Sequence, residues 1–210
     1  MRLTKLGHAC VRLEKKGAVL VIDPGIWSGP DPLAGANAVL VTHEHSDHLD
    51  PALVRAALGA DTDVQLWANP SVAGQFAEFG ERVHPVAHGD AFDAAGFDVH
   101  VYGREHARIL PGIPVIANTG FAVDATVFHP GDSFTVPDDP VPMLLMPVSA
   151  PWLKLTEVAE FVRASEPVRG IAIHDAILSD AGVGLLSSLL MALRPDGSLS
   201  RLEPGSQVEL

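Results

Sequence analysis

Four side chains that can bind a metal ion stand within one short segment, THEHSDH: His43, His45, Asp47 and His48. Side chains two residues apart point the same way in an extended backbone, so His43 and His45 can reach one ion, with Asp47 near the same side. His48 begins the following turn and points elsewhere, towards a second ion. Imidazole and carboxylate groups suit Zn²⁺ and similar divalent ions, so this spacing predicts a metal site.

The cluster closes a predicted strand, residues 37–43, whose apolar residues are typical of a strand buried on both faces. Ligand sites gather at the carboxyl ends of such strands in layered α/β folds. A solvated loop that happens to be rich in histidine is the simpler alternative. Four ligand-type side chains at this spacing favour the metal site over that alternative.

Two ions need more ligands than this segment supplies, and three later positions offer them. His106 follows the predicted strand FDVHVYG, Asp132 stands in a turn after ATVF, and His174 ends the strand GIAI. Alone, each is a weak signal, because Pro-Gly-Asp is common turn chemistry and a histidine at a strand end often only makes a hydrogen bond. Each follows an apolar run, so all three can converge on one edge of the fold.

The elements that must position these residues alternate along the chain. Asp50 and Pro51 predict the N-cap and first turn of a helix that ends near Gly59, and a second helix runs from Asn69-Pro70 to Gly80. Strand-rich segments flank these helices, and the pattern repeats towards the C-terminus, with a helix capped by Thr156. The order predicts an α/β fold with two β layers and helices outside them. The predicted strands are two around the EKKG turn, then NAVLVTH, DVQLWA, RVHPVA, FDVHVYG, IPVIANTG, FAVDATVF, PMLLMPV and GIAIHD.

Composition limits what the protein can be. A chain of 210 residues with 47% hydrophobic residues suits one domain, residues 1–210, with a sizeable core. The formal net charge of −12 argues against nucleic acid or an anionic membrane as a partner. Cys10 is the only cysteine, so no internal disulfide can form, and we expect it to be a buried small hydrophobic residue. The N-terminal segment lacks a signal-peptide core, and the apolar run 183–193 is too short to cross a bilayer and predicts a buried helix, so we expect a cytoplasmic protein.

At these motifs the chain resembles the metallo-β-lactamase superfamily. THEHSDH is similar to the superfamily's T-H-x-H-x-D-H motif, and REHAR, HPGDS and IAIHD follow in the family's order. The N-terminal LTKLGHACVRLE and VLVIDP, together with LLMPVSAPW, resemble the branch that contains ascorbate-6-phosphate lactonase and related metal-dependent hydrolases. The resemblance covers essentially the whole chain and implies a four-layer αβ/βα sandwich.

The resemblance also implies two divalent metal ions, with zinc expected and manganese, nickel or iron as alternatives. A hydroxide bridging the two ions would attack a small ester-type substrate such as a lactone, a phosphate ester or a thioester. The implied ligands are His43, His45 and His106 for the first ion, Asp47, His48 and His174 for the second, and Asp132 as the bridge.

Two residues are candidates for catalysis beyond metal binding. Asp47 can bind one ion while its other oxygen orients the attacking hydroxide or moves a proton. His8, in the G-H-A segment, is either a group that contacts the substrate and stabilises negative charge or a structural hydrogen-bonding residue. Whether Trp152, Arg104 and Arg108 touch the substrate stays open.

Several other functions remain possible at this point. A metal-dependent nuclease or phosphodiesterase is one, although the acidic charge and the lack of a basic stripe argue against it. A non-hydrolytic protein that keeps the fold and binds metal is another. A di-iron protein that handles oxygen would use a carboxylate in place of His106, and Glu105 could supply it. The expected partner is a small-molecule substrate, and a homo-oligomer is possible.

Overall fold

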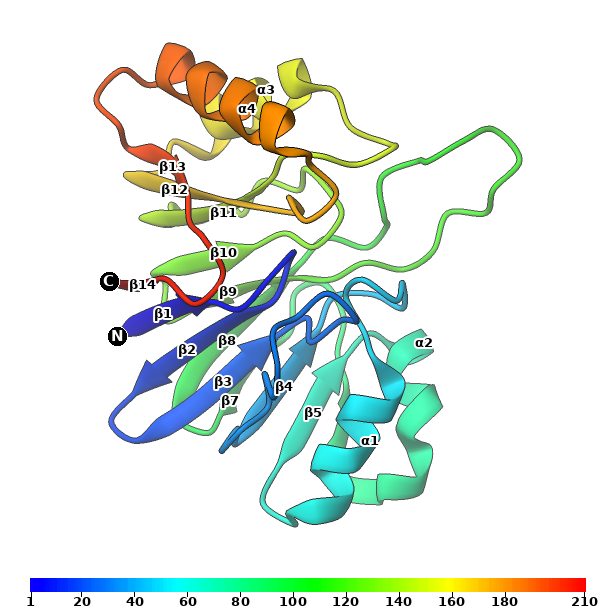
Figure 1. The fold of residues 1–210 in the computed structure, drawn as a ribbon. Coiled ribbons are helices and arrows are strands. Elements are labelled where there is room, and N and C mark those ends of the chain that lie inside the picture. The colour runs from blue at the N-terminus through cyan, green and yellow to red at the C-terminus, as the bar shows by residue number, and fades with distance from the viewer.

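Two β-sheets packed face to face form the centre of the computed structural model, which describes residues 1–210 (Figure 1). The first sheet has the strand order β14-β1-β2-β3-β4-β5-β6 and the second β13-β12-β11-β10-β9-β8-β7. The strands of the first sheet are β1 (Arg2–Lys5), β2 (Val11–Lys15), β3 (Ala18–Ile22), β4 (Ala38–Val41), β5 (Gln65–Ala68), β6 (Val83–Pro85) and β14 (Gln207–Glu209). Those of the second are β7 (Ala91–Ala94), β8 (Phe97–Tyr102), β9 (Gly120–Val123), β10 (Val127–His129), β11 (Met143–Pro147), β12 (Arg169–Ile173) and β13 (Leu199–Arg201).

Helices cover the outer face of each sheet (Figure 1). Asp50 caps the helix on the first sheet, because its carboxylate accepts from the backbone N–H groups of Ala52 and Leu53. No helix is long and apolar enough to cross a membrane. The two sheets and the helices that cover them confirm the predicted α/β fold of four layers. On the first sheet lie α1 (Pro51–Ala60), α2 (Pro70–Ala73) and the 3₁₀ helix η1 (Gly74–Arg82), and on the second α3 (Leu155–Ser165) and α4 (Asp180–Leu193).

Side chains that point alternately to the two faces of a sheet explain why central strands such as β4 are apolar along their whole length. In β4, Leu40 faces the core between the two sheets, whereas Val39 and Val41 face the core under α1. On the second sheet, Ile171 of β12 faces the core between the sheets and Ala172 the core under α3 and α4. Both faces of the sheets are covered at β4 and β12, so these strands carry apolar residues on both sides.

Strand direction brings many loops to one edge of the sandwich. β3, β4, β5 and β6 pair in parallel, and so do β10, β11, β12 and β13. β1 is separated from β3 by one antiparallel strand, as β8 is from β10, so β1 and β8 run in those same directions. The loops after β1, β3, β4, β8, β10 and β12 therefore leave at the carboxyl edges of the two sheets.

The N-terminal segment differs from its prediction because it forms three strands and not two. Gly7 has φ of +154°, and a Cβ there would stand 2.3 Å from the carbonyl oxygen of Trp27. The chain therefore turns between Lys5 and Val11 and separates β1 from β2. The turn around Lys16 and Gly17 then joins β2 to β3, as expected.

Several other elements were misjudged from sequence. The predicted strand IPVIANTG is a loop with one isolated bridge, between Glu105 and Ala117, while β7 and the C-terminal strands β13 and β14 were missed. Thr156 lies inside α3, whose N-cap is Lys154. The helix over 183–193 is only partly buried, because α4 buries Leu186 and Leu190 but leaves other large side chains exposed. Short strands and exposed apolar residues leave little periodic signal, which explains these errors.

Candidate metal centre

All seven side chains implied as ligands lie together at the carboxyl edge of the sandwich. Four come from the loop after β4 and one each from the loops after β8, β10 and β12. They form two groups, and within each group the possible ligand atoms lie within 4.8 Å of one another. His8, which follows β1, joins the second group. The first group is His43, His45, His106 and Asp132, and the second is His8, Asp47, His48 and His174.

Asp132 connects the two groups. Its Oδ1 lies 3.1 Å from Nε2 of His48, and its Oδ2 lies 3.2 Å from Nε2 of His106 and 3.1 Å from Nε2 of His174. Burial alone would raise the pKa of the Asp132 carboxyl. The positive charge of His48 and the close approach of His106 and His174 hold that pKa well below its usual range.

The outward nitrogen of each central histidine is already engaged. Nδ1 of His48 donates to Oδ2 of Asp23 at 2.7 Å, and Nδ1 of His174 donates to the carbonyl oxygen of Ser149 at 2.6 Å. Nδ1 of His106 likewise faces the carbonyl oxygen of Ala107. A carbonyl or carboxylate oxygen can only accept, so Nδ1 carries a proton in all three rings. The inward Nε2 atoms then offer a lone pair when the ring is neutral.

Buried polar atoms without partners indicate that these residues fit a bound metal ion. Nε2 of His48, His106 and His174 and Oδ1 of Asp132 are buried, yet none has a partner in hydrogen-bonding geometry. A buried polar atom left in this way costs about 1–3 kcal/mol. Four such atoms point into one small region, and imidazole nitrogen with carboxylate oxygen is a donor set for zinc and similar ions.

Asp23 organises the loop that carries His48. It has φ of +54°, and its carboxylate accepts from both the backbone N–H and the hydroxyl of Thr42, at 2.8 and 2.7 Å. Two glycines let the loops approach each other. A Cβ on Gly25 would stand 2.0 Å from the Asp47 carbonyl oxygen, and one on Gly131 would stand 2.2 Å from Oδ1 of Asn118. The segments DPG and HPGD therefore need glycine for close backbone approach.

A buried ion cluster holds the loop of His174. His174 has φ of +60°, which is strained for a residue with a side chain. The next residue, Asp175, accepts from Nζ of Lys5 and from Nε of Arg201, both at 2.6 Å. Lys5 is fully buried on β1, and Arg201 belongs to β13. The network joins the two sheets directly behind the centre. Because Asp175 bonds to Lys5 and Arg201 and not to the imidazole of His174, it orients the backbone of His174 and not its ring.

His8 is held in a defined orientation. The backbone N–H of Ala176 donates to Nδ1 at 3.2 Å, so Nδ1 must be the unprotonated nitrogen and Nε2 carries the hydrogen. That Nε2 lies 3.2 Å from Oδ2 of Asp47. Burial lowers the pKa of His8, although the hydrogen bond to Asp47 opposes this, so the ring is neutral at neutral pH.

The side chains whose role was open fall into two classes. Trp152 contacts the centre, because its indole N–H donates to Oδ2 of Asp132 at 2.9 Å. Arg104, Glu105 and Arg108 are exposed while His106 between them is buried, so Glu105 does not replace His106 in the cluster. Cys10 is buried, as expected.

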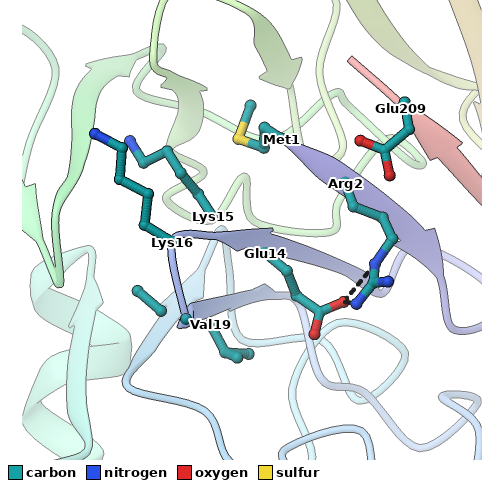
Figure 2. A pocket seen from close by; sticks show the side chains of 9 residues that line it. Met1, Arg2, Glu14, Lys15, Lys16, Val19 and Glu209 are labelled. Atoms are coloured by element: carbon teal, nitrogen blue, oxygen red, sulfur yellow. Dashed lines mark hydrogen bonds and ion pairs between the residues drawn. The ribbon is translucent and has the colours of Figure 1, made fainter.

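A surface hollow lies away from this centre (Figure 2). It measures about 660 Å³ and lies where β1 begins and where β2 turns into β3, at the opposite ends of the strands. Figure 2 shows the Arg2–Glu14 ion pair across it, while Lys15 and Lys16 point away from that pair. No histidine lines this hollow, so we place no chemistry there.

Comparisons of the sequence with known proteins agree with this geometry. A family model described as beta-lactamase superfamily domain matches residues 2–174. The protein Rv0786c of Mycobacterium tuberculosis is 37% identical over 191 residues, which cover 88% of this chain and 89% of that protein. A protein of Chelativorans sp. named UPF0173 metal-dependent hydrolase is 30% identical over 151 residues, with 63% of each chain covered.

A solved structure shows the same fold. Igni18, described as a novel metallo hydrolase from the archaeon Ignicoccus hospitalis, superposes with a TM-score of 0.75 and covers 99% of this chain and 97% of its own. The two sequences are 18% identical, so this similarity concerns the arrangement of the sheets and helices alone.

Removing the buried acid should destabilise the fold. We expect Asp175→Leu to lower the free energy of unfolding by about 3–5 kcal/mol, because Lys5 is left buried without its counter-charge. The double variant with Lys5→Met should recover part of the loss. Urea unfolding of the metal-free protein measures both, with Asp98→Leu on an exposed strand position as the control. A double variant less stable than Asp175→Leu would contradict this account.

Proposed function

Because the chain belongs to the β-lactamase superfamily, we propose that it is a metal-dependent hydrolase that uses two divalent metal ions to cleave a small ester-type substrate. The observation that carries the proposal is the convergence of buried, unpartnered imidazole nitrogens and a carboxylate oxygen on one region. The names of relatives such as the Chelativorans protein support the reaction class.

The two groups of side chains suggest how the ligands divide. In this proposal the first ion takes the histidines of the first group, and the second ion takes Asp47, His48 and His174. Asp132 would hold both ions, since its two oxygens already approach histidines of both groups. Zinc is the expected ion, but the same ligand set accepts manganese, nickel or iron.

The chemistry divides between the ions and the protein. Divalent ions at such a site lower the pKa of a bound water to about 7 and polarise the oxygen of the substrate's carbonyl or phosphoryl group. The protein's own contribution includes Asp47. Burial would raise the pKa of Asp47, but hydrogen bonding with His174 and His8 and the charge of His48 keep it well below its usual range. Asp47 is therefore ionised at neutral pH, and it can accept a proton or orient a water molecule.

His8 acts in this proposal as a hydrogen-bond donor and not as a ligand. Its Nε2 carries the hydrogen because Nδ1 accepts from the backbone of Ala176. In the absence of substrate this N–H faces Asp47. With substrate bound it can donate to the oxygen on which negative charge develops, which is the contact that stabilises the transition state of acyl transfer.

Metal content and turnover test the function together. Protein loaded with zinc or manganese should hold two ions per chain and hydrolyse at least one of a lactone, a phosphodiester and a thioester. We expect His48→Ala to lose at least about 100-fold in kcat/KM, because the variant lacks both a ligand and the partner of Asp23. His100→Ala, at an exposed position of β8, is the matched control and should retain full activity.

The proposal fails if the metal-loaded protein turns over none of these substrates, or if His48→Ala retains activity. A coloured preparation that contains iron and consumes oxygen would point instead to di-iron chemistry.

Metal binding should release protons at neutral pH. Burial opposes protonation of both His174 and His48, but the carboxylates of Asp132 and Asp47, 3.1 and 3.4 Å from Nε2 of His174, raise the pKa of His174 to about 9. Asp132 and Asp23 raise the pKa of His48 well above its usual value. A metal ion needs unprotonated Nε2, so binding must displace these protons. The apparent affinity should rise at least about tenfold per pH unit between pH 7 and 9, since each displaced proton contributes a factor of ten.

Titration calorimetry in buffers of different ionisation enthalpy measures this release. At least one proton per chain should leave at pH 7. An affinity that is independent of pH over this range would show that the histidines are neutral in the metal-free protein.

A further inference from the structure

Two of the three tryptophans lie at the candidate metal centre, one from each sheet. The Trp152 ring lies 5.9 Å from that of His106 and 6.3 Å from that of His174, and its indole N–H is used by Asp132. The Trp27 ring lies edge-on to that of His8, with 4.8 Å between centroids. Trp152 is thus engaged in holding the centre, whereas Trp27 is 44% exposed beside it.

The backbone that carries Trp27 is fixed on both sides. The N–H of Ile26 donates to the carbonyl oxygen of Ser46 at 2.9 Å, and the N–H of Gly29 donates to that of Leu6 at 2.8 Å. The missing side chain of Gly7 also lets the Trp27 carbonyl approach closely. The turn is therefore fastened between the loop of His8 and the loop of Asp47. A tryptophan on a rigid backbone offers a large contact surface at a small entropic cost.

Two further large apolar side chains are exposed on the two chain segments that contact His8. Ile26 precedes Trp27 and is 52% exposed. Ile177 is 49% exposed and follows Ala176, whose N–H donates to His8. Exposed apolar side chains are ordinary when they stand alone, but several on the segments around convergent polar groups are the composition of a ligand site.

The charge of the residues around Trp27 also limits the kind of substrate that this surface can bind. The three apolar residues Trp27, Ile26 and Ile177 bring no cation. The exposed Arg104 and Arg108 stand in the loop of His106, which belongs to the other group of ligands. These three side chains therefore offer an anionic group no counter-charge, in a chain whose net charge is already −12.

We propose that Trp27, Ile26 and Ile177 form the binding surface for an uncharged apolar group of the substrate. The proposal rests on the proposed function and narrows it to carboxylic esters, lactones or thioesters with an alkyl or aryl acyl group. In the reaction, the oxygen of water bonds to the acyl carbon and the bond from that carbon to the leaving oxygen or sulfur breaks. One proton of the water passes to the leaving atom, and the acyl product is a carboxylic acid.

Methyl esters of acetate, butyrate and hexanoate, hydrolysed by the metal-loaded protein, test this surface. We expect kcat/KM to rise about twofold to fourfold per methylene, mainly through KM, as apolar surface becomes buried. Trp27→Ala should lower the ratio of hexanoate to acetate kcat/KM by about tenfold. Val168→Ala is the matched control, because Val168 is 67% exposed and lies just before the start of β12, at the opposite edge from His174.

A second measurement does not depend on turnover. Hexanamide, which the centre should hydrolyse slowly or not at all, is titrated into the metal-free protein while the indole N–H signals are followed by NMR. The Trp27 signal, assigned by its loss in Trp27→Ala, should shift. The signal of Trp67, which stacks on Phe92 in the interior, should stay in place, and acetamide should have a smaller effect.

The outcomes separate this inference from the function on which it rests. Turnover that is independent of chain length, or that prefers a phosphodiester to the hexanoate ester, overturns the apolar surface and leaves the hydrolase in place. If no ester is cleaved but hexanamide still shifts Trp27, the proposed function fails and the apolar surface stands. A dimer that Trp27→Ala converts to a monomer would mean that the surface meets a second copy of the chain, and would also overturn the inference.

Discussion

A buried carboxylate surrounded by histidines from both sheets is the constraint on which the rest of this structure depends. Asp132 approaches His48, His106 and His174 at 3.1–3.2 Å, yet its Oδ1 and the three Nε2 atoms lack hydrogen-bonding geometry. Burying polar atoms without partners is costly, so the fold stores an unfavourable arrangement at one edge. An arrangement of this kind is stable when a cation binds there, which links the architecture to the chemistry.

The surrounding loops hold this arrangement in place. Asp23 and His174 both adopt positive φ, and each is held by a network that reaches another part of the fold. Asp23 binds Thr42 and His48, and Asp175 beside His174 binds Lys5 and Arg201. Strain of this kind persists only where the neighbouring contacts determine the backbone, and here it occurs directly beside the ligands. The distances at the centre thus depend on residues that cannot themselves bind metal there.

The polar centre and its apolar neighbours divide the work of a hydrolytic site. The histidines and aspartates place charge and proton acceptors where a bond would be cleaved, and the indole of Trp152 fixes Asp132 through a hydrogen bond. Trp27 on the opposite side is exposed and free to meet a substrate. In this proposal the same edge of the sandwich combines a candidate ion site with a surface suited to apolar groups.

The local sequence determined the first cluster and the main elements. Both signals are local. The spacing of His43, His45 and His48 follows an apolar run, and Asp50-Pro51 marks a helix start, so each depends only on the backbone of neighbouring residues. His106, Asp132 and His174 were weak candidates from their places after apolar runs, and the resemblance implied how they divide between the two ions. Only the tertiary structure decided which groups support them: the ring of His174 is held by Ser149, and Asp175 binds Lys5 and Arg201 instead. These contacts join β1, β12 and β13, and pairing between distant strands leaves no periodic trace in the sequence. For the same reason the C-terminal strands and the place of Trp27 beside His8 could be found only in the folded chain.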